Sequence, residues 1–501
     1  MAIVEDEVRN ESGEENEIEV VVEEDDGEEQ DSADEDSDDD GSDDEEMLET
    51  KVAMLEQRVT ENPYNYDDHI ELIQALWRSS ELDRWREAFN RLQKMSLVSS
   101  EHWVMRLQTE SSLAHSQADI ERIADLFQQA LLDCFTLSVL TEWCTWALHL
   151  SDIEFSRKQL EDIVKRAGAD PLSGKIFWDA KKEFETTQLE TMSEDEPGYK
   201  EQVARILYCV EEVVSRPLLH HDESWAEFEE WATKVKDKEY IEKVKLQHEA
   251  AADFLEKITR FEDKLLTLVD PEEKCDVYQE YISMVKQLAE DSDKYGECDV
   301  NGILKVLYER STSDCLTTER CYDLCAAFIE HVHAHSSRSS YKRAVEACTR
   351  RQPHVHKFWT SAMRQAEKDG KEFDEIKSIL ETALSRGMKS FKEADFLWMS
   401  YLESVRRHTD FEDPSSVDRL RRTFRLAWDS LAEAWGAAAD ESFVPIYWAR
   451  VEYTRVRDHV RGREIFEEAI TDGRASCPIP QLSTKRGLKW PVTHSRVRSS
   501  N

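Results

Sequence analysis

The sequence has 501 residues, of which 108 are acidic, 64 are basic and only 14 are glycine, so its formal net charge is −44. A chain of this length with average composition would carry about 35 glycines, and β-sandwiches, barrels and Rossmann folds use glycine in their turns. The shortage argues against these classes and favours long helices joined by few loops.

The charge is unevenly spread along the chain. Residues 1–50 hold 26 acids and one base, residues 51–473 hold 82 acids and 57 bases, and residues 474–501 hold six bases and no acid. An acidic body does not suit binding to a phosphate backbone, which needs clustered lysine and arginine. We therefore expect weak or indirect RNA contact. Since no apolar run approaches the roughly 18 residues that span a bilayer, we also expect no membrane contact.

Residues 1–50 are predicted to form a disordered acidic tail, because they repel one another and include no aromatic side chain. Ile18, Val20, Val21 and Val22, followed by four acids, fit a SUMO-interacting pattern that adds a strand to a partner's sheet, although a chance aliphatic cluster fits equally well. Three serines with an acid three residues later are candidate sites for a kinase of the casein kinase 2 type: Ser32, Ser37 and Ser42. A simple solubilising tail explains the same acids.

From Leu55 to about Gly473, apolar residues follow helical spacing and a large aromatic residue recurs. These repeat anchors are Trp103, Trp143, Trp178, Trp225, Tyr278, Tyr322, Trp359, Trp398 and Trp448. Successive anchors are 35 to 53 residues apart, which fits a unit of two helices and their turns. Since one such unit cannot bury its apolar face alone, neighbouring units must stack. We therefore predict that the anchors are structural and do not serve as platforms for stacking bases.

The Trp-x-x-Tyr type of first helix and the Phe-Glu-x-Ala type of second helix resemble the HAT (half-a-TPR) repeat of RNA-processing factors. The fold we expect is an all-α, right-handed superhelical solenoid of about ten HAT/TPR-like helix pairs. A long helix near 239–266 is expected to divide it into an N-terminal half, 51–269, and a C-terminal half, 270–473. Asp270-Pro271 predicts the helix start of the second half, and residues 474–501 are expected to be a disordered basic tail.

Three short segments carry a closer resemblance: NPYNYD at 62–67, LWMSYL at 397–402 and RRHTDF at 406–411. They resemble segments of the HAT-repeat splicing factors that recycle U4/U6 snRNPs. This resemblance implies a non-enzymatic nuclear scaffold in pre-mRNA splicing, present in the nucleoplasm and Cajal bodies. It implies snRNP proteins and ubiquitin-specific proteases as partners. Two alternatives stay open: an adaptor that recruits ubiquitin-specific proteases to spliceosomal or histone substrates, and a HAT scaffold of mRNA 3′-end processing. No RNP motif of an RRM follows residue 473, so RNA annealing is not expected of this sequence.

The resemblance also implies a homodimer formed by the C-terminal half, about 275–473. The last predicted helix carries Ile465, Phe466, Ala469 and Ile470, and one side of this apolar face has no neighbouring repeat in the sequence. A second copy could cover it under closed symmetry. A concave acidic groove along the body is the expected binding surface for a basic peptide or an amphipathic helix.

Candidate chemistry is sparse. The Walker, G-x-S-x-G, H-E-x-x-H and G-x-G-x-x-G motifs are missing, so we predict neither catalysis nor a cofactor. Cys321 and Cys325, with His331, His333 and His335, include two i, i+4 pairs that could bind zinc. Burial of the thiols as small apolar groups explains the cysteines better, so no metal site is predicted there. The ten scattered cysteines are expected to be reduced.

Overall fold

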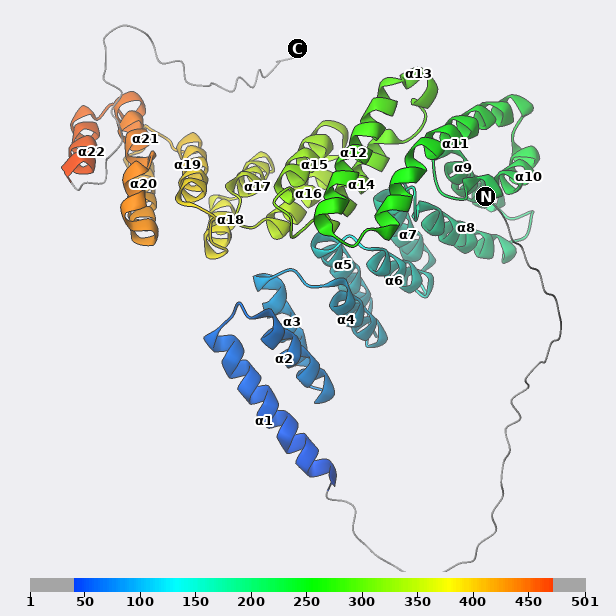
Figure 1. Cartoon of the computed structure of the whole chain (residues 1–501), viewed down its shortest axis with the longest axis horizontal. Helices are drawn as coiled ribbons and strands as arrows, with labels where there is room; N and C mark the ends of the chain where they lie inside the picture. Colours follow the sequence, from blue (N-terminus) through cyan, green and yellow to red (C-terminus); the bar gives the residue numbers. More distant parts are fainter. Residues whose placement is uncertain (1–39, 472–501) are drawn as a thin grey trace, which may run out of the picture. The chain divides into compact units, whose positions relative to one another are not determined.

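The computed structural model of the chain describes residues 40–471, in which there are 22 α-helices and no strand (Figure 1). The predicted all-α fold of helix pairs is therefore confirmed. None of the helices in this range is long and apolar enough to cross a membrane. The following predicted sites and segments lie outside the described residues: Ile18, Val20, Val21, Val22, Ser32, Ser37, the side chain of Ser42, and the segment 474–501.

The chain divides into two compact units between Ala88 and Phe89, within helix α3 (Leu82–Met95). In the first unit, α1 (Asp40–Glu61) packs against α2 (Tyr66–Arg78). Residues 40–50 are helical, although the sequence analysis predicted disorder up to residue 50. Val52, Leu55 and Val59 of α1 are buried, and this tertiary packing stabilises the helix despite its acidic sequence.

The second unit continues as consecutive helix pairs, each helix packed against its partner. The pairs are α4 (Ser100–Ser112) with α5 (Gln117–Asp133), α6 (Leu137–Leu148) with α7 (Ile153–Ala167), α8 (Gly174–Glu190) with α9 (Tyr199–Ser215), α10 (Trp225–Val235) with α11 (Lys238–Thr267), α12 (Pro271–Glu290) with α14 (Val300–Asp314), α15 (Cys321–His335) with α16 (Arg338–Arg351), α17 (His356–Lys368) with α18 (Phe373–Ser385), α19 (Phe391–Arg407) with α20 (Pro414–Trp435), and α21 (Val444–Val451) with α22 (His459–Thr471). Four short elements lie between them: η1 (His221–Ser224), α13 (Ser292–Tyr295), η2 (Gly436–Glu441) and η3 (Glu452–Val456). With α2 and α3, the described residues hold about ten pairs, as predicted.

Side chains fix where several helices begin. The carboxylate of Asp270 accepts a hydrogen bond from the Glu273 amide at 3.2 Å, and Pro271 occupies the first turn of α12. This is the predicted helix start, because proline has no amide hydrogen to lose at that position. Asp413 caps α20 in the same way, again followed by a proline, Pro414. The predicted long helix is also present, as α11.

Every predicted anchor lies in the first helix of its pair. Seven anchors are buried, and Trp225 and Tyr322 are half-buried. Two of the buried anchors donate their indole N–H groups to nearby acceptors: Trp103 Nε1 donates to Asp133 Oδ2 at 3.0 Å, and Trp143 Nε1 donates to Gln159 Oε1 at 3.1 Å. The rings of Trp103 and Trp143 therefore fill the space between helices.

Helix pairs that are far apart in sequence also pack together in the second unit. Helix α5 contacts α16, and Arg350 of α16 forms an ion pair with the buried Asp133 at the end of α5. The Arg350 Nη2 group also donates to the carbonyl oxygen of Gln93 at 3.1 Å. Nearby, the Phe135 amide donates to Ser313 Oγ at 3.3 Å. The repeat pattern predicted packing only between helix pairs that are adjacent in sequence. The second unit therefore contains contacts that this pattern did not predict.

Candidate functional site

The cysteines and histidines of α15 make separate contacts. Cys321 Sγ lies 3.9 Å from Cys325 Sγ in the core, and the Cys348 thiol donates to the Cys325 carbonyl oxygen at 3.7 Å. The His331 ring bonds elsewhere, through Nε2 to the carbonyl oxygen of Asn301 at 3.1 Å. The thiols thus behave as small core groups, the interpretation preferred from the sequence.

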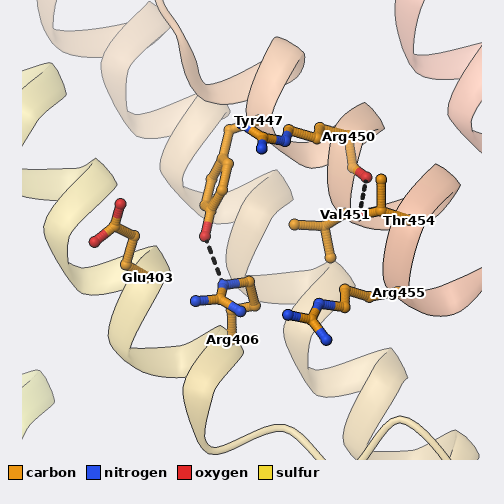
Figure 2. Close-up of a pocket in the computed structure, with 7 residues that line it drawn as sticks. All are labelled: Glu403, Arg406, Tyr447, Arg450, Val451, Thr454 and Arg455. Carbon is orange, nitrogen blue, oxygen red and sulfur yellow. Dashed lines mark hydrogen bonds between the residues drawn. The ribbon is translucent and has the colours of Figure 1, made fainter. Parts of the chain in front are cut away.

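A hollow of about 490 Å³ lies between α19 and α21 (Figure 2). Three arginines, Arg406, Arg450 and Arg455, line it together with a single acid, Glu403. The remaining lining residues are Tyr447, Val451 and Thr454. The charge of this arginine hollow is therefore opposite to that of the acidic body around it.

Helix geometry brings the arginines of the hollow together. Arg406 lies in the last turn of α19, whereas Arg450 and Arg455 belong to α21 and the π-helical turn that follows it. In Figure 2 the side chains of Arg406 and Arg455 extend into the same space beneath the Tyr447 ring. Residues that are 49 positions apart in sequence thus meet because the first helices of successive pairs lie side by side.

The hydrogen bonds of the hollow leave guanidinium groups available. Arg406 Nε donates to the Tyr447 hydroxyl at 2.9 Å, which fixes the direction of its side chain. Glu403 lies 3.7 Å from Arg407, a neighbour outside the hollow. Among residues 40–471, no carboxylate forms an ion pair with Arg406 or Arg455. A guanidinium presents several N–H donors in one plane, so this arrangement suits a carboxylate or a phosphate.

Burial raises the pKa of the half-buried Tyr447, although Arg406 opposes the shift both by its charge and by its hydrogen bond. The hydroxyl is therefore protonated and can donate its own hydrogen while accepting from Arg406. Tyr447 thus adds a neutral donor to the charged rim. This hollow is not evident from the sequence, in which its only signal is a pair of arginines at the ends of two successive anchor helices.

The chain is similar in sequence to several known proteins. Residues 50–267 match the family described as Suppressor of forked protein (Suf). Over 442 residues the chain is 24% identical to Spliceosome associated factor 3, U4/U6 recycling protein, of Mus musculus and of Homo sapiens, covering 85% of this chain and 42% of each relative. It is 30% identical to RNA-binding protein 4F of Drosophila melanogaster over 125 residues, which is 25% of this chain and 12% of that protein. A chain in the structure of Naa15/Naa10 bound to HypK-THB aligns over 86% of this chain and 76% of its own length, with 11% identity and a TM-score of 0.20.

The anchored helix pairs place the described residues in the class of all-α helical-repeat proteins. More particularly, residues 50–267 match the Suf family, and the chain is similar over 85% of its length to the U4/U6 recycling proteins. It spans about two fifths of the length of these curated relatives.

Proposed function

We propose that the chain is a non-enzymatic scaffold of nuclear RNA processing, acting in pre-mRNA splicing through the assembly or recycling of U4/U6 snRNPs. The observation that carries this proposal is the homology to U4/U6 recycling proteins across 85% of the chain. The ordered helix pairs add physical support, because helical repeat arrays typically bind partners along extended surfaces.

The proposed partners are proteins of the snRNP. The body at 51–473 has 25 more acids than bases, which opposes binding to the phosphates of naked RNA. Most anchor rings are buried and cannot stack on bases. Protein contacts are therefore the main means by which this scaffold would join a ribonucleoprotein particle, in the nucleoplasm and in Cajal bodies.

The arginine hollow is the proposed contact point for an acidic segment of such a partner. Its two guanidinium groups without an ion pair in the described part of the chain, on Arg406 and Arg455, can each hold a carboxylate with paired hydrogen bonds. The Tyr447 hydroxyl can donate a further hydrogen bond. A partner with several neighbouring acids would match this set of donors.

Charge reversal tests the contact point. The variant R406E/R455E should recover severalfold less snRNP protein from nuclear extract than the original chain. The matched control K392E/R422E changes the charge equally at exposed positions outside the hollow and should bind normally. Circular dichroism should show that both variants are folded. Equal recovery by all three proteins would refute this contact point.

Affinity purification of the tagged full chain, followed by mass spectrometry, tests the function itself. Enrichment of U4/U6 snRNP proteins is the expected result. Ubiquitin-specific proteases in the same fraction would support the second proposal, that the scaffold recruits these enzymes to spliceosomal or histone substrates. Enrichment of cleavage factors without snRNP proteins would instead favour a scaffold of 3′-end processing and contradict the splicing role.

A homodimer through the C-terminal half is part of the proposal. Within α22, Ile465 and Ala469 are buried, whereas Val460, Phe466 and Ile470 are exposed. A second copy could cover this exposed side. Light scattering of the full chain should give twice the monomer mass, and F466D/I470D should restore the monomer. A monomer mass for the original chain at every concentration would contradict the dimer.

A further inference from the structure

Two histidines and an aspartate meet where η1 lies against α11. His221 and Asp222 begin η1, and His248 comes from α11. One ligand atom from each of the three side chains lies within 4.8 Å of the others. His221 is only 2% exposed, whereas the side chain of Asp222 is 77% exposed, so the cluster has a buried end and an end open to water.

Backbone carbonyl groups set the tautomer of both imidazoles. His221 Nδ1 lies 2.9 Å from the Leu218 carbonyl oxygen, and His248 Nδ1 lies 2.8 Å from the Val214 carbonyl oxygen. A carbonyl oxygen can only accept, so we assign the hydrogen of each neutral ring to Nδ1. Each Nε2 then carries a free lone pair. Histidines that bind metals usually have this arrangement, with the second ring nitrogen donating to a carbonyl or carboxylate oxygen.

Both lone pairs converge on the same carboxylate. Asp222 Oδ1 is 3.4 Å from His221 Nε2 and 3.7 Å from His248 Nε2. His221 Nε2 is buried and has no hydrogen-bond partner among the described residues. Three electron-rich atoms that face one another, one of them buried, repel unless a cation lies between them.

The spacing of these atoms suits a metal ion. Zinc bonds of about 2.0–2.1 Å in a tetrahedral site place neighbouring ligand atoms about 3.3–3.4 Å apart. The distances of 3.4 and 3.7 Å from Asp222 to the two rings are close to this edge length, and all three ligand atoms lie within 4.8 Å of one another.

The surrounding residues hold the two rings in place. Trp225 stacks on His248, with ring centroids 4.8 Å apart and an angle of 27° between the planes. Before His221, His220 adopts a left-handed conformation with φ of 63°. Non-glycine residues rarely adopt this conformation, and it persists only where surrounding contacts require it. Surrounding contacts therefore hold this loop in the conformation that places His221 and Asp222 beside α11.

We propose that His221, Asp222 and His248 bind one divalent transition-metal ion, with zinc as the expected ion. Two imidazole nitrogens and one carboxylate oxygen are borderline ligands that suit zinc better than calcium or magnesium. The exposed side of Asp222 leaves the fourth position to water. The ion would join η1 to α11 and so hold α10, which follows η1, against α11. This structural role is independent of the proposed splicing function.

The full chain, freed of metal with a chelator, tests the site by titration with zinc chloride in a calorimeter. The original chain should bind one equivalent of zinc. D222N and H248Q should each bind zinc at least about tenfold more weakly. D222N changes an exposed side chain, so its folding should be preserved. H220N is the matched control, because asparagine tolerates the left-handed conformation and His220 is not a ligand.

Cobalt(II) gives a second readout that separates this site from the thiols. The original chain should show visible absorption typical of nitrogen and oxygen ligands without the charge-transfer band of a thiolate, and D222N should lose that absorption. Zinc affinity that is the same in the original chain, D222N and H248Q would overturn the proposal. A thiolate band that persists in all three proteins would also overturn it, since the metal would then be bound by cysteine.

Discussion

Arg310 of α14 holds the carboxylate of Glu262 of α11 through two hydrogen bonds, of 2.9 Å from Nη1 and 2.7 Å from Nη2. The Nη1 group also donates to Asp170 Oδ1 at 2.8 Å. Asp170 lies in the loop before α8, 140 residues earlier in the chain. One arginine therefore joins three segments, and both of its carboxylate partners are largely buried.

The first prediction is that R310M destabilises the fold by about 3–5 kcal/mol, because it leaves two buried carboxylates without their shared cation. Urea denaturation followed by circular dichroism measures the loss. R260M changes an exposed arginine of α11 and should cost less than about 1 kcal/mol. Similar losses of unfolding free energy in the two variants would show that the Arg310 ion pairs stabilise the fold no more than an exposed arginine does.

Trp398 is the anchor of α19, and its ring is buried. The centroids of the Trp398 and Tyr401 rings are 6.2 Å apart. We predict that W398A lowers the free energy of unfolding by about 3–5 kcal/mol, the range for truncation of a large buried aromatic ring. L426A, on the exposed side of α20, is the control and should have little effect. An unchanged midpoint for W398A in urea would mean that the ring is a contact residue and not part of the core.

His331 should make stability depend on pH. Burial lowers the pKa of His331 below its ordinary value of 6.5, and His335 and Lys286 lower it further, while the hydrogen bond to Asn301 opposes the shift. The Tyr308 ring also faces it, at 5.7 Å. The unfolded chain therefore takes up a proton at a higher pH than the folded chain, so stability is lost as the pH falls below 6.5.

The corresponding measurement compares free energies of unfolding at pH 7.5 and pH 5.5. The decrease between the two should be smaller in H331Q than in the original chain. H333Q, at an exposed position of the same helix, should keep the full decrease. An identical decrease in H331Q would mean that His331 does not contribute to acid sensitivity.

The cysteines should react slowly in the folded chain. The nine within residues 40–471 are buried and free of disulfides. Burial raises the pKa of Cys134 and of Cys209 to about 12, so little reactive thiolate forms at pH 8. The variant C477S removes the one cysteine outside the described residues. Its labelling by iodoacetamide should be at least tenfold slower in buffer than in urea, and equal rates would contradict the described burial.

The sequence predicted the local unit well because each unit carries its own signals. Trp103 and Trp448 mark first helices by periodicity, and Asp270-Pro271 marks a helix start by the chemistry of the first turn. The contact of Arg350 with Asp133 was not predictable in this way. That contact depends on the small rotations that accumulate from one helix pair to the next. A short sequence pattern does not determine the total rotation over several pairs.

The candidate sites were harder to predict for the same reason. His221 and His248 are 27 residues apart and on different elements, so their spacing matches no short metal motif. The only zinc candidate that the sequence suggested, and that we set aside, lies on one helix: Cys321, Cys325, His331, His333 and His335. Similarly, Arg406 and Arg455 meet only because α19 and α21 pack side by side.

The most direct test of the central claim is co-elution of the purified full chain with purified U4/U6 snRNP, compared with the protein-free U4/U6 RNA. A scaffold that acts through protein contacts should elute with the particle and not with the naked RNA. Absence of the chain from the particle fraction would contradict the splicing role. Equally tight binding to the naked RNA would contradict recognition through protein.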